Sequence, residues 1–176
     1  MDNYTEFLQR LDTAAASLKT RQTRLNHALW AVRTAAEQNQ FGFDEWTERK
    51  RRLEVLLPGR DAEGSAALKD LHGVSANMKA VFQGRSERVN TRLAAVQTKV
   101  DQINSSLHNL ELSKQKLTSS RELSEERARL SEAMLGLAGT AEGIAVATPD
   151  GGLQDDLKTA REAVVMAEAL LEVKGN

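Results

Sequence analysis

Apolar residues recur at alternating spacings of four and three through most of this 176-residue sequence. Because an α-helix has 3.6 residues per turn, that spacing places the apolar side chains on one narrow stripe of a helix. The stripe is cleanest over residues 3–39, where it is formed by Tyr4, Leu8, Leu11, Ala15, Leu18, Gln22, Leu25, Leu29, Val32 and Ala36. A stripe of this kind needs another helix to cover it, so the sequence predicts helix pairing of the coiled-coil type.

Two later segments carry the same heptad pattern. In residues 86–118 the stripe is formed by Val89, Leu93, Val96, Val100, Ile103, Leu107, Leu110, Lys114 and Leu117. In residues 153–173 it is formed by Leu153, Leu157, Ala160, Val164, Ala167 and Leu171. With only two prolines and 4% aromatic residues, the composition also favours long helices over a thick globular core.

The fold class that follows is all-α: an elongated antiparallel helical bundle or coiled coil with long heptad-patterned helices, in a single domain over residues 1–176. Six helices are predicted, at residues 3–39, 45–57, 65–83, 86–118, 121–140 and 153–173. A glycine-rich stretch predicts a flexible linker at about 141–152. The heptad pattern slips near Thr118–Ser120 and resumes at Leu123, Leu130, Met134 and Leu137. The slip leaves two alternatives open, a tight turn between two helices or one long helix over residues 86–140.

Residues 41–60, FGFDEWTERKRRLEVLLPGR, combine three aromatic residues with a block of four basic ones. Gly42 is predicted to break the first helix, and Asp44 is a suitable N-cap for the next. Pro58 and Gly59 are expected to end that short helix. The stretch is therefore predicted to form a corner in which Phe41, Phe43 and Trp46 pack near Trp30.

The basic block has two interpretations. Glu45 and Glu48 precede Arg49 and Arg52 by four residues each, so ordinary helix ion pairs account for the charges. The alternative is a binding site for an acidic partner. Its candidate partner-binding residues are Trp46, Arg49, Lys50, Arg51 and Arg52.

Catalytic and cofactor chemistry has no signature in the sequence. The chain has no cysteine, so cysteine-ligated metals and thiolate nucleophiles are excluded. His27, His72 and His108 lack a carboxylate three or four residues before them, so the helical Glu-x-x-His metal motif is absent. No phosphate-binding glycine loop is present. We therefore expect no enzyme activity, no catalytic residue, no metal site and no cofactor.

The predicted function is that of a noncatalytic structural or adaptor protein, which self-associates or binds a protein partner within a larger assembly. The partner is expected to be a protein or a second copy, and nucleic acid is not expected because the net charge is −1. An alternative class is a peripheral protein that binds acidic lipid surfaces through amphipathic helices, and a third is a helical-bundle enzyme or ligand carrier. The N-terminal sequence is polar and acidic and lacks the pattern of a signal peptide, which predicts a cytoplasmic location and leaves open export by a route without a cleaved signal.

Overall fold

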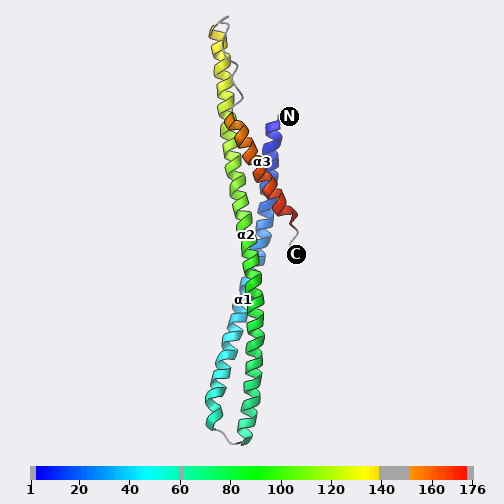
Figure 1. The fold of residues 1–176 in the computed structure, drawn as a ribbon, viewed down its shortest axis with the longest axis vertical. Coiled ribbons are helices and arrows are strands. Elements are labelled where there is room, and N and C mark those ends of the chain that lie inside the picture. Colours follow the sequence, from blue (N-terminus) through cyan, green and yellow to red (C-terminus); the bar gives the residue numbers. More distant parts are fainter. Residues whose placement is uncertain (1–2, 60–61, 139–150, 174–176) are drawn as a thin grey trace. The chain divides into compact units, whose positions relative to one another are not determined.

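The computed structural model describes residues 3–59, 62–138 and 151–173, and all the elements in these ranges are helices (Figure 1). In chain order they are α1 (Asn3–Leu56), the short 3₁₀ helix η1 (Leu57–Gly59), α2 (Ala62–Ala138) and α3 (Gly151–Glu172). The long helices pack antiparallel, and no strand occurs in the described ranges. The predicted all-α fold with long heptad-patterned helices is confirmed.

The predicted break at Gly42 is wrong. Residues 3–39 and 45–56 belong to one helix of 54 residues, which ends at Leu56. A Cβ atom at Gly42 would lie 2.3 Å from Cε1 of Phe82, far inside van der Waals contact. The glycine therefore makes room for the Phe82 ring against the backbone of α1. Its cost to the helix, about 1 kcal/mol relative to alanine, does not break an element that packs along its length.

The predicted boundaries inside α2 are also wrong. Residues 65–83, 86–118 and 121–138 all lie in one helix of 77 residues. The alternative of a turn at Thr118–Ser120 is thereby excluded, and the helix passes through the slip in its heptad pattern. The predicted linker at 141–152 lies outside the described residues except at its end, because α3 already begins at Gly151.

The chain divides into two compact units, residues 1–23 with 101–176 and residues 24–100. Their described parts are called the three-helix unit and the hairpin unit below. The three-helix unit contains the start of α1, the second half of α2 and all of α3. The hairpin unit contains the rest of α1 and the first half of α2, joined through η1. That the whole chain forms a single domain stays a prediction.

The three-helix unit holds most of the buried side chains. Its buried apolar residues are Phe7, Leu11, Ala14, Leu18, Ile103, Leu110, Leu117, Ala160, Val164 and Ala167. The predicted stripes of α2 and α3 supply many of them. On α1, however, Phe7 and Ala14 are buried although they lie beside the predicted stripe. Because α1 contacts two helices here, its apolar face is wider than the stripe that one partner would need.

Polar contacts fix α3 against the two other helices. Arg21 donates to the backbone carbonyl oxygens of Leu170 at 2.6 Å and Leu171 at 2.9 Å, and also to that of Val173. Leu170 and Leu171 belong to the last turn of α3, and Val173 directly follows the helix. At this end the helix offers no N–H partner to its carbonyl groups, and a positive charge is favourable. Near the other end of α3, Ser120 donates to the carboxylate of Asp156.

The hairpin unit is a pair of antiparallel helices with little full burial. Within residues 24–59 and 63–100, only Leu29, Ser75 and Val100 are buried. Most other stripe positions, such as Val89 and Leu93, are half-buried. Two helices alone cover one side of each other, so the remaining sides of this hairpin stay accessible to a further element.

Candidate partner-binding surfaces

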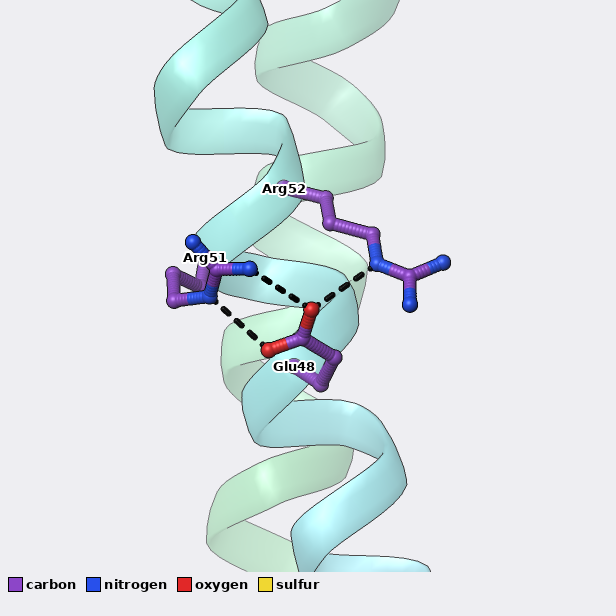
Figure 2. Close-up of polar contacts among 3 residues, drawn as sticks. All are labelled: Glu48, Arg51 and Arg52. Carbon is purple, nitrogen blue, oxygen red and sulfur yellow. Dashed lines mark hydrogen bonds and ion pairs between the residues drawn. The ribbon is translucent and has the colours of Figure 1, made fainter.

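The predicted basic site lies in the last turns of α1. Arg51 donates from Nε and Nη2 to the two carboxylate oxygens of Glu48, each at 2.8 Å. Arg52 donates to the same carboxylate at 2.9 Å, so Glu48 is held between the two guanidinium groups (Figure 2). Arg49 pairs with Glu45 at 3.2 Å, which confirms both predicted i,i+4 pairs.

The remaining charges of this stretch are matched as well. Lys50 pairs with Glu54 at 3.3 Å, and Nε2 of His72 lies 3.0 Å from the same carboxylate. The hydrogen bond from His72 and then that from Lys50 lower the pKa of Glu54. Arg49 also stacks on the Trp46 ring, 4.6 Å from its centroid. Each cation of the block is therefore paired with a carboxylate on the hairpin, and binding of a partner to Trp46 and Arg49–Arg52 stays a prediction.

The predicted aromatic corner is not formed. Trp30 is 71% exposed and Phe41 is 69% exposed, while Phe43 and Trp46 are half-buried. Because α1 continues through Gly42, no change of direction brings these rings together. Eleven residues separate Trp30 from Phe41, which places both on the same side of α1, three helical turns apart.

We expect the pKa of Glu48 to show directly whether Arg51 and Arg52 pair with its carboxylate. Hydrogen bonds from Arg51 and then Arg52 lower the pKa of Glu48 from its ordinary 4.5 to about 2. The charged form is thus favoured in the folded state, so its stabilising effect is present above pH 4.5 and is lost as the pH falls toward 2. In an Arg51→Gln, Arg52→Gln variant, NMR titration should find this pKa close to 4.5.

The same variant should barely change thermal stability at neutral pH, because exposed ion pairs contribute little. We expect its melting temperature to stay within about 2 °C of that of the unaltered protein. A Glu48 pKa that does not rise in the variant would show that the arginines do not hold this carboxylate. A large fall in melting temperature would contradict their assignment to the surface.

A second surface lies at the C-terminal end of α2. Tyr4 at the start of α1 lies under Arg121, and Asp156 near the start of α3 contacts Ser120. Both neighbouring helices therefore begin close to residues 120–121 of α2. Beyond this level every residue of α2 from 125 to 136 is exposed. In Figure 1 the last turns of α2 have no helix beside them among the described elements.

Large apolar side chains lie in this accessible segment. Leu130 is 65% exposed and Met134 is 58% exposed, and both continue a heptad stripe from the half-exposed Leu123. Leu135 is also exposed but lies off this stripe. The heptad pattern predicted this stripe. It did not predict that the stripe would be exposed, because the exposure depends on where α1 begins relative to α2, which only the alignment of the packed helices decides.

A third surface is a groove in the hairpin unit, with a volume of about 580 Å³. One wall consists of three arginines of α2, namely Arg85, Arg88 and Arg92, and the other carries the amides of Gln38 and Asn39 on α1. Ala35, Phe82 and Val89 supply its apolar lining. Sequence reasoning missed this site, although the i, i+3, i+7 spacing of the arginines was a usable signal.

Groups suited to other chemistry are scarce in the described part of the chain. No set of three His, Asp or Glu residues gathers there in a way that could hold a metal ion. His27 and His108 are exposed, and His72 contacts Glu54 as described above. None of the described helices is both long and apolar enough to span a membrane.

Comparison with known proteins adds no relative from which a function could be transferred: no family model matches the chain, and neither a curated protein nor a solved structure matches it.

Proposed function

We propose that this chain is a noncatalytic coiled-coil structural or adaptor protein, which binds a helix of a protein partner or of a second copy through the end of α2. The observation that carries this proposal is the exposed heptad stripe of Leu123, Leu130 and Met134 on a helix segment without a described neighbour. The three-helix unit supports the rigid presentation of that segment, since α1 and α3 hold α2 up to residue 121.

The stripe has the dimensions of a short coiled-coil contact. Residues 123–138 span roughly 24 Å at about 1.5 Å per residue. Burying a leucine or methionine side chain contributes on the order of 1.5–3 kcal/mol each, and a partner helix would add similar side chains of its own. The summed contribution is large enough to offset much of the entropy lost on association.

A lipid surface is a less suitable partner for this stripe. Helices that lie on acidic membranes have a broad apolar face bordered by lysine and arginine. The α2 stripe is narrow, and the exposed Glu126 lies beside it. A noncatalytic role rests on the lack of cysteine and of metal-ligand spacing in the sequence, and the cytoplasmic location stays a prediction.

The test is a pair of double variants in the accessible end of α2. Leu130→Glu with Met134→Glu places two charges on the stripe and should abolish self-association in sedimentation equilibrium, or binding of the native partner. Ala128→Glu with Leu135→Glu adds the same charge off the stripe and also removes an exposed leucine, so association should persist. Neither pair should alter the melting temperature by more than about 2 °C, because exposed positions contribute little to folding.

Equal loss of association in both double variants would mean that general hydrophobicity, and not the heptad stripe, drives binding. A protein that remains monomeric at micromolar concentration, with no specific partner recovered from its native cell, would contradict the proposal. Flotation with acidic vesicles that depends on Leu130 and Met134 would instead support the lipid alternative.

A further inference from the structure

We propose that the arginine groove of the hairpin unit is a docking site for a third helix, an acidic amphipathic helix from a partner protein. Its acidic residues would meet Arg85, Arg88 and Arg92, and its apolar residues would meet Leu71, Val74 and Val81. This site is separate from the end of α2 and does not depend on the function proposed for it.

The heptad register identifies the groove as a position for a helix. In the three-helix unit, α3 lies against α1 near Arg10 and Arg21 and against α2 near Ser120. The sides of α1 and α2 that face α3 carry buried residues, namely Phe7 and Ala14 on α1 and Ser106 and Ser113 on α2.

The same heptad positions recur along the hairpin unit. Steps of seven from Phe7 and Ala14 lead to Ala35, and steps of seven from Ser106 and Ser113 lead to Arg92 and Arg85. All three of these residues line the groove. The positions that α3 covers in one unit are therefore accessible in the other, where the described residues include no third helix.

The charge of the groove selects an acidic occupant. None of its three arginines has a carboxylate within ion-pair distance in the described ranges, and Arg85 stacks only on the Phe82 ring, at 5.7 Å. The arginines at the end of α1 differ, because each of Arg49, Arg51 and Arg52 pairs with a glutamate of its own helix. Guanidinium groups that lack a counter-charge are the ones available for bidentate contacts with carboxylates.

The apolar neighbours of the arginines extend the same side of α2. Leu71, Val74 and Val81 are exposed, and Met78 is half-buried between them. Their spacing of three and four continues without a slip into Arg85, Arg88 and Arg92. A partner helix of about 22 residues would cover this side over roughly 32 Å, with an apolar half followed by an acidic half.

A nucleic acid fits the surface less well. A phosphate backbone would follow the arginines for only about 10 Å before reaching the apolar side chains between Leu71 and Val81. The Phe82 ring is not free for base stacking, because it packs against the backbone at Gly42. An amphipathic helix uses both halves of the surface, whereas a nucleic acid uses one.

The experiment measures fluorescence anisotropy of a labelled 22-residue helical peptide, with leucine stripes in one half and glutamates flanking the stripe in the other. A second peptide carries glutamine in place of each glutamate. Both are titrated with the full chain and with two triple variants. Arg85→Gln, Arg88→Gln, Arg92→Gln alters the groove, and Lys116→Gln, Lys158→Gln, Arg161→Gln removes equal charge from exposed positions of the three-helix unit.

The acidic peptide should bind the unaltered chain, and the groove variant should weaken it by about tenfold, as expected for the loss of three exposed charge pairs. The control variant should change the affinity by less than about twofold, and added salt should weaken binding to the unaltered chain. Circular dichroism confirms that both variants remain helical.

Several results would overturn the proposal. One is equal weakening by both triple variants, which would indicate a response to net charge. A second is equal affinity for the glutamine peptide, or no binding of either peptide. A third is tighter binding of a single-stranded oligonucleotide or of acidic vesicles at the same arginines. A fourth is self-association of the unaltered chain that the groove variant abolishes, which would make a second copy the occupant.

Discussion

Replacing Leu110 by alanine should lower the free energy of unfolding by about 2–5 kcal/mol, the range for a buried leucine whose removal leaves a cavity. Leu110 is 2% exposed in the core of the three-helix unit, where Leu117 and Val164 are also fully buried. Urea unfolding followed by circular dichroism measures the change.

Two further substitutions on α2 serve as controls. Gln102 is exposed, so Gln102→Ala should change the free energy of unfolding by less than about 0.5 kcal/mol. Leu107 is half-buried, and Leu107→Ala should fall between the two. Equal costs at Leu110 and Gln102 would show that the buried stripe of α2 has been assigned incorrectly.

Replacing Gly42 by leucine should destabilise the hairpin unit by about 1–3 kcal/mol, the usual cost of forcing extra atoms into a packed contact. Three carbon atoms of the Phe82 ring lie within 2.7 Å of the position that a Cβ atom would take. The ring must move away, and it loses its packing against α1. This loss should exceed the gain of about 1 kcal/mol that leucine gives a helix relative to glycine.

Gly73 provides the matched control, because a Cβ atom there would meet nothing within 4 Å. Gly73→Leu should therefore stabilise the chain by up to about 1 kcal/mol through helix propensity alone. In a Phe82→Ala background, Gly42→Leu should also become neutral or stabilising, since the clash is gone. A Gly42→Leu variant that is as stable as Gly73→Leu would contradict the close approach of Phe82.

The sequence by itself determined the fold class and much of the core. Heptad spacing is a local property, so it identified α3 with its buried Ala160, Val164 and Ala167. It also identified the i,i+4 pairs of Glu45 with Arg49 and of Glu48 with Arg52, because one helix contains both partners. For the candidate binding surfaces, the sequence located the basic block and the apolar stripe that begins at Leu123. It did not indicate which of their side chains remain exposed and unpaired, and so available to a partner.

Only the tertiary structure decided where helices end and which faces are covered. Gly42 lies inside a continuous helix. The glycine fits there because the Phe82 ring, forty residues later in the chain, occupies the space that a side chain at position 42 would take. Phe7 and Ala14 are buried because α3 covers a second side of α1, which no local pattern could indicate. The arginine groove, for the same reason, depends on which helix lies beside α2 and on which carboxylates come within reach. Local periodicity predicts that a helix has an apolar face, and the packing of distant segments decides what covers that face.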